Sequence, residues 1–131
     1  MDEPSKANRP AVPGHTEQPM PVDPDPSVRS AHDLVCMELR DMGGLTEALR
    51  WAAIGYVNKR AELGLKRYGQ RLVPNDGRDR LRDALEESAD LVAYLADLRR
   101  SGGLRDDRTY HLAVSVFLDL VAQREGVRWP W

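Results

Sequence analysis

The chain has 131 residues, of which 41% are hydrophobic and 31% charged, and its formal net charge is −2. This length allows one domain with a modest core. The near-neutral charge argues against a nucleic-acid-binding protein, because such proteins gain affinity from excess positive charge. A single cysteine, Cys36, excludes an intrachain disulfide and cysteine-rich zinc or iron–sulfur sites.

Membrane insertion and secretion are not indicated by the sequence. No apolar run approaches the roughly 20 residues that span a bilayer. The N-terminus lacks the apolar segment of a signal peptide. We therefore expect a cytoplasmic protein that does not associate with membranes.

Proline dominates the first part of the chain. Seven of the nine prolines lie within residues 1–26, and no Phe, Trp or Tyr precedes Trp51. Proline removes backbone donors, and a segment with few large apolar side chains cannot offset the entropy lost on ordering. We predict a disordered tail over residues 1–28 and a folded domain over residues 29–131.

Two helices are predicted in the first half of the folded domain. Ser30 and Asp33 form a capping-box pattern at the start of a helix that runs to about residue 42, before two glycines. Thr46 is the expected N-cap of the next helix, which ends near residue 68. Four residues of this second helix recur at helical spacing and are expected to face inward: Leu49, Ala53, Tyr56 and Leu63.

Two more helices are predicted after a turn at Pro74–Gly77. The third covers about residues 78–100, and the fourth begins after Asp106 or Asp107 and ends near Gly126. Four apolar residues of the third helix fall on one face: Leu81, Leu85, Val92 and Leu95. The predicted fold class is all-α, an antiparallel four-helix bundle. Its core is modest, so we expect a homodimer or a larger homo-oligomer.

The third predicted helix carries an unusual concentration of acidic residues. Five carboxylates lie between positions 83 and 97, with no Lys or Arg among them: Asp83, Glu86, Glu87, Asp90 and Asp97. Like charges three or four residues apart repel, and no internal Lys or Arg offsets this repulsion, whereas a divalent cation would. Mg²⁺, or Mn²⁺ in its place, suits such hard oxygen ligands. The alternative is an acidic face that only meets water.

A basic stretch precedes this acidic face. Residues 59–82 contain eight Lys or Arg residues and three acidic ones. Cationic side chains beside a carboxylate-bound metal are suited to holding a polyphosphate, although surface Arg/Glu pairs are the simpler interpretation. The candidates for phosphate contact are Lys66, Arg67 and Arg71, with Arg78 or Arg80 assisting from the turn.

The acidic segment also suggests a family. A six-residue segment resembles the Glu-Glu-Leu-Gly-Asp-Leu motif of MazG-like nucleoside triphosphate pyrophosphohydrolases: Glu86-Glu87-Ser88-Ala89-Asp90-Leu91. These enzymes belong to an all-α superfamily that includes dimeric dUTPases. Residues 64–95 look like small MazG-like proteins of actinobacteria and their phages. The resemblance covers residues 58–100. It implies cleavage of the α–β phosphate bond of a nucleoside triphosphate, to a monophosphate and pyrophosphate, with Mg²⁺ held by carboxylates of two adjacent helices.

The resemblance assigns roles to individual acids. Glu87 and Asp90 match the Glu-x-x-Asp half of the family's metal site, and Glu86 matches the Glu that precedes it. The Glu-x-x-Glu half has no match, so Glu62 is our choice for the remaining carboxylate, with Glu38 as the second choice. The expected catalytic and metal-binding set is Glu62, Glu86, Glu87 and Asp90. Because the Glu-x-x-Glu half of the family's metal site is missing, the alternative is a non-catalytic helical interaction or nucleotide-sensing module.

Overall fold

The computed structural model describes residues 18–23, 25 and 27–128. Most of the predicted tail (residues 1–17, 24 and 26) and the last three residues of the predicted domain lie outside the described residues. The contacts divide the chain into two compact units, the first ending at Arg78 and the second beginning at Asp79.

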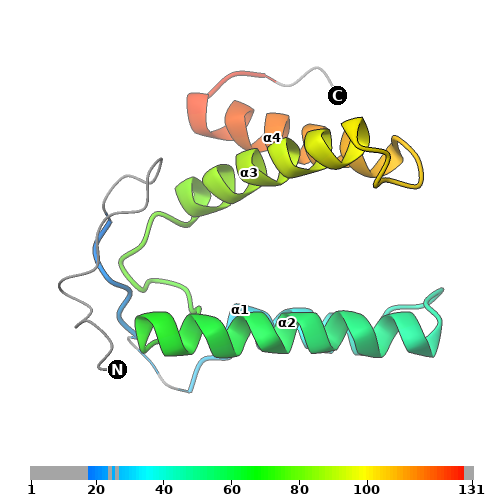
Figure 1. The fold of residues 1–131 in the computed structure, drawn as a ribbon. Coiled ribbons are helices and arrows are strands. Elements are labelled where there is room, and N and C mark those ends of the chain that lie inside the picture. Colours follow the sequence, from blue (N-terminus) through cyan, green and yellow to red (C-terminus); the bar gives the residue numbers. More distant parts are fainter. Residues whose placement is uncertain (1–17, 24, 26, 129–131) are drawn as a thin grey trace, which may run out of the picture. The chain divides into compact units, whose positions relative to one another are not determined.

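The described residues form four helices and no strand, which confirms the predicted all-α class (Figure 1). The first unit contains α1 (Ala31–Asp41) and α2 (Glu47–Tyr68), and the second contains α3 (Arg80–Arg100) and α4 (Arg108–Glu125). The packing of all four as one bundle stays a prediction. Within the described part of the chain, none of these helices combines the length and apolar character needed to cross a bilayer.

Local capping chemistry sets the helix ends where the sequence predicts them. The Ser30 hydroxyl accepts a hydrogen bond from the backbone N–H of Asp33 at 3.1 Å, and Thr46 does the same for Leu49 at 3.1 Å. These side chains satisfy N–H groups that have no partner inside the helix. Gly69 ends α2 in the left-handed conformation, with φ of 69°, where a residue with a Cβ would be strained.

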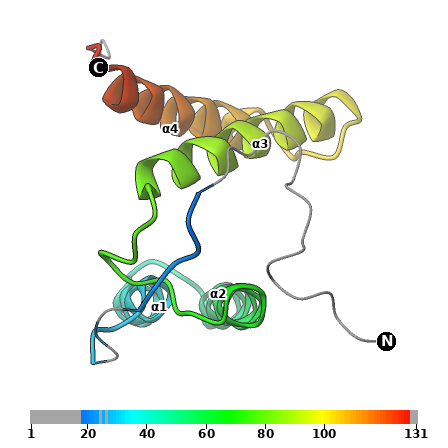
Figure 2. The ribbon, with the colours of Figure 1, turned by 90° about the vertical axis from the view of Figure 1, so that its left-hand side faces the viewer.

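The first unit is an antiparallel helix pair. Arg50, in the first turns of α2, donates to the backbone oxygens of Leu39 and Arg40 at the end of α1, the latter at 2.9 Å. Further along, Cys36 of α1 lies with its Sγ 3.4 Å from the side-chain oxygen of Asn58 in α2. Figures 1 and 2 agree in showing α1 and α2 side by side.

The predicted inward face of α2 is wrong in part. Leu49, Tyr56 and Leu63 are exposed, whereas Ile54 is buried. The half-buried positions include Ala53, Val57, Ala61 and Gly64. The helix has two apolar stripes, because Leu49, Tyr56 and Leu63 lie on the side opposite Ile54 and Ala61. The contacts of Arg50 and Asn58 with α1 show that α1 packs on the side that contains Ile54.

The second unit is also an antiparallel pair, joined at both ends by ion pairs. Arg99, near the end of α3, holds Asp107 at the start of α4 through two hydrogen bonds of 2.9 and 3.0 Å. At the opposite end, Arg124 in the last turn of α4 lies 2.5 Å from Asp79, which caps α3. The third predicted helix therefore begins two residues later than expected, at Arg80, because Asp79 is its N-cap.

The apolar face predicted for α3 is the face that contributes to the core. Leu95 and Ser88 are buried, and the other predicted members of this face are half-buried: Leu81, Leu85 and Val92. From α4, the buried residues are Ala113 and Ala122. Larger residues of α4 are half-buried, including Phe117, Leu118, Leu120 and Val121, so the fully buried core of this unit is small.

Candidate functional site

The acidic face of α3 is partly neutralised by arginines at its two ends. Three ion pairs link residues three or four positions apart: Arg80–Asp83 at 3.1 Å, Arg82–Glu86 at 3.3 Å, and Arg100–Asp97. No Lys or Arg lies within the acidic run itself, as the sequence predicts, and the arginines that offset the repulsion lie outside it. Arginine is long enough to reach one turn along the helix, so residues that flank the acidic run neutralise its ends.

The middle of the face differs from its ends. Glu87 and Asp90 lie one turn apart on α3, and both are exposed. Neither carboxylate takes part in an ion pair or hydrogen bond with any residue that the structure describes. Within the described residues nothing neutralises their charges, and because both side chains are exposed their oxygens are accessible to a cation.

The predicted set of four carboxylates is divided between the two units. Glu62 is exposed on α2 in the first unit, and Glu86 on α3 turns to Arg82. Over residues 18–23, 25 and 27–128, no group of three or more His, Cys, Asp or Glu side chains is arranged to hold a metal ion. Mg²⁺ commonly takes only one or two protein carboxylates, with substrate phosphates and water as its other ligands. Glu87 and Asp90 fit that smaller requirement.

The five cationic residues predicted to contact phosphate have different surroundings. Lys66 and Arg67 are exposed in the last turn of α2, and neither has an acidic partner among the described residues. The Arg67 guanidinium lies over the ring of Tyr68, 5.2 Å from its centroid. By contrast, Arg71 is held by Asp23, Arg78 donates to the backbone, and Arg80 pairs with Asp83.

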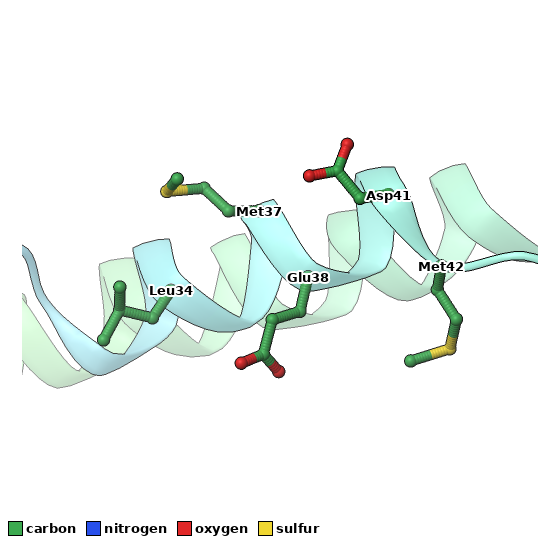
Figure 3. A pocket seen from close by; sticks show the side chains of 5 residues that line it. All are labelled: Leu34, Met37, Glu38, Asp41 and Met42. Carbon is green, nitrogen blue, oxygen red and sulfur yellow. The ribbon is translucent and has the colours of Figure 1, made fainter.

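A shallow open groove lies along α1 and includes the second-choice ligand Glu38 (Figure 3). Its lining residues are Leu34, Met37, Glu38, Asp41 and Met42. Figure 3 shows the carboxylates of Glu38 and Asp41 pointing away from each other. Two carboxylates that diverge in this way do not share a cation, so the groove does not strengthen the case for Glu38 as a ligand.

Asp79 is an acid whose role was not predicted. One of its carboxylate oxygens accepts from Arg124, and the other accepts from the backbone N–H of Arg82 at 3.1 Å. The hydrogen bond from Arg124, followed by that from Arg82, lowers the pKa of Asp79 below its ordinary value of 3.8. This pair contributes to stability only while Asp79 is charged.

We expect Asp79→Asn to lower the Tm near neutral pH and to have little effect in acid. The pKa of Asp79 is lower in the folded protein than in the unfolded chain, so charged Asp79 stabilises the fold above about pH 4. That contribution is lost as the pH falls through the lowered pKa. Asparagine still caps a helix, so the substitution removes mainly the charge. Thermal unfolding at several pH values tests this, with Asp119→Asn on α4 as the control, and a Tm difference that persists at about pH 2 would contradict it.

Sequence reasoning missed two acids of the first unit. Asp23 accepts two hydrogen bonds from Arg71, although 48 positions separate them. Asp76 is buried, and its carboxylate accepts from the backbone N–H of Arg78 at 3.1 Å. The Asx-type turn at Asp76 has a local sequence signal in the neighbouring Gly77, but the sequence contains no local signal for the long-range pair.

No family model, curated protein or solved structure matches this chain. The likeness to MazG-like enzymes rests on residues 58–100 and stays a prediction.

Proposed function

We propose that the chain is a Mg²⁺-dependent nucleoside triphosphate pyrophosphohydrolase, which cleaves the α–β phosphate bond to give a nucleoside monophosphate and pyrophosphate. One observation carries the proposal. Glu87 and Asp90 are exposed and have no charged partner among residues 18–23, 25 and 27–128, whereas the other three acidic residues of α3 pair with arginine. The motif that resembles the MazG-like enzymes contains these same two residues.

In this proposal Glu87 and Asp90 would hold the metal ion, and Glu86 of the same helix would complete the ligand set or position the attacking water. When bound, Mg²⁺ neutralises the polyphosphate and polarises the phosphorus that is attacked. Lys66 and Arg67 are exposed and bind phosphate oxygens of the substrate through charge-assisted hydrogen bonds. For Glu86 to join, its carboxylate must leave the Arg82 guanidinium, which lies 3.3 Å away.

The direct test is an assay of pyrophosphate release. The purified full-length chain is incubated with each standard nucleoside triphosphate, and with damaged ones, in the presence of Mg²⁺. We expect release that stops when the metal is chelated. Folded protein that releases no pyrophosphate from any of these substrates would contradict the proposal.

An observation also favours the second candidate, a non-catalytic helical interaction or nucleotide-sensing module. Many large apolar side chains are exposed on the described helices, including Leu34, Leu49, Trp51, Tyr56, Leu91, Tyr94 and Leu112. Single exposed apolar residues are ordinary, but so many on small helix pairs fit a surface that binds protein. If Mg²⁺ and nucleotides leave the Tm unchanged, ligand binding to the folded state is absent and this candidate is favoured.

The same exposed residues support a homodimer or a larger homo-oligomer. A second copy would cover apolar area that the helix pairs leave in contact with water. Light scattering on the purified chain measures the mass in solution. A monomer at all concentrations would contradict this part of the proposal.

A further inference from the structure

The guanidinium of Arg71 is enclosed by one short segment of the chain. Its Nε and Nη2 donate to the same carboxylate oxygen of Asp23, at 2.9 and 2.7 Å. Nη1 donates to the backbone oxygen of Val28 at 2.6 Å, and Nη2 also reaches that of Asp25 at 3.3 Å. Among the described residues, every hydrogen bond of this side chain thus goes to Asp23, Asp25 or Val28.

The segment that carries Asp23 is attached at other points as well. The N–H of Val22 donates to the backbone oxygen of Asp76 at 2.8 Å, and Arg78 donates to that of Pro19 at 3.4 Å. Asp76 itself is buried. These contacts hold the Asp23 carboxylate next to Arg71, so the two groups pair within the folded chain.

A carboxylate and a phosphate compete for the same donors. The guanidinium presents a planar set of N–H groups that match the oxygens of either anion. Nε and Nη2, the edge best suited to an oxyanion, are already used by Asp23. The side chains of Arg71 and Asp23 are only 30% and 14% exposed, so solvent screens their attraction less than that of a surface pair.

We infer that Asp23 is an internal competitor of phosphate at Arg71, and that an incoming phosphate group must displace it. The inference rests on the proposed function and adds to it Arg71, which the sequence analysis names as a candidate for phosphate contact. A site that is open for a fraction of the time binds its ligand with an apparent affinity reduced by that fraction. Nucleotide binding at Arg71 and the ion pair between Arg71 and Asp23 are then mutually exclusive.

The test uses inorganic pyrophosphate without metal as the probe, titrated calorimetrically into the full-length chain. Asp23→Ala should bind pyrophosphate more tightly than the wild type, by about tenfold if the site is open for a tenth of the time. Asp25→Ala is the matched control, because its backbone oxygen contacts Arg71 while its carboxylate bonds to Ser27. It should bind as the wild type does. Adding Arg71→Ala to Asp23→Ala should abolish the gain.

Three outcomes would overturn the inference. Equal affinity for wild type and Asp23→Ala means that Asp23 does not compete, and weaker binding by Asp23→Ala means that it positions Arg71. No binding to any variant means that Arg71 is not an anion site. The hydrolysis assay separates these results from failure of the proposed function. Tighter binding by Asp23→Ala without pyrophosphate release from nucleotides would support the anion site and reject the enzyme.

Discussion

Asp90→Asn is expected to reduce Mg²⁺-dependent pyrophosphate release by about 100-fold or more while leaving the fold intact. The loss follows from removing one of two proposed protein ligands, since electrostatic stabilisation of the transition state at such sites is worth at least that much. The fold should persist because Asp90 is exposed and its carboxylate is unpaired among the described residues. Less repulsion from Glu86 and Glu87 should stabilise α3 by a few tenths of a kcal/mol, roughly.

The matched control for this substitution is Asp97→Asn. Asp97 lies on the same helix, is exposed, and pairs with Arg100. The change in charge is identical, so a general electrostatic effect would lower both activities. We expect Asp97→Asn to retain activity. Equal losses in the two variants, or a large loss of helicity in Asp90→Asn, would reject Asp90 as a metal ligand.

Leu95→Ala is expected to destabilise the second unit by about 2–5 kcal/mol. Leu95 is 8% exposed and lies in the small core between α3 and α4. Removing its side chain loses apolar burial and leaves a cavity that the surrounding structure fills only in part. Chemical denaturation followed by circular dichroism measures the change in the free energy of unfolding.

Leu91→Ala provides the comparison, on the same helix and with the same loss of atoms. Leu91 is 47% exposed, so we expect a destabilisation of less than about 1 kcal/mol. If the two variants lose equal stability, Leu91 is buried against another surface in solution, and the assignment of the α3 core face is incomplete.

Local signals explain why the helices could be predicted from the sequence. Ser30 and Thr46 cap through their own side chains, and Gly69 and Gly126 end helices in the left-handed conformation. Each of these effects acts within a few residues, so sequence spacing is enough to detect it.

The core face of α2 could not be predicted for a physical reason. Large residues such as Leu49 and Tyr56 dominate the periodic pattern, yet α1 packs on the stripe that contains Ile54 and Ala61. Which of two apolar stripes a helix buries depends on the shape of its neighbour. That information is not contained in the helix itself.

In the candidate site, too, local features could be predicted from the sequence and long-range ones could not. The sequence places Glu87 and Asp90 one turn apart on a helix, because helical spacing is local. It does not reveal that Glu86 turns to Arg82, nor that Asp23 holds Arg71 from 48 positions away. Helical spacing permits the Arg82–Glu86 pair but does not select the rotamers that form it, and the long-range pair depends on chain topology, which no spacing rule specifies.

The most direct test of the central claim is to locate a bound divalent ion by NMR, with Mn²⁺ as a paramagnetic substitute for Mg²⁺ and a non-hydrolysable nucleoside triphosphate present. The proposal predicts that substoichiometric Mn²⁺ broadens the backbone amide signals around Glu87 and Asp90 first, and that Asp90→Asn removes this effect. Broadening that is absent from α3, or that is centred on Glu38 and Asp41 of α1, would contradict it.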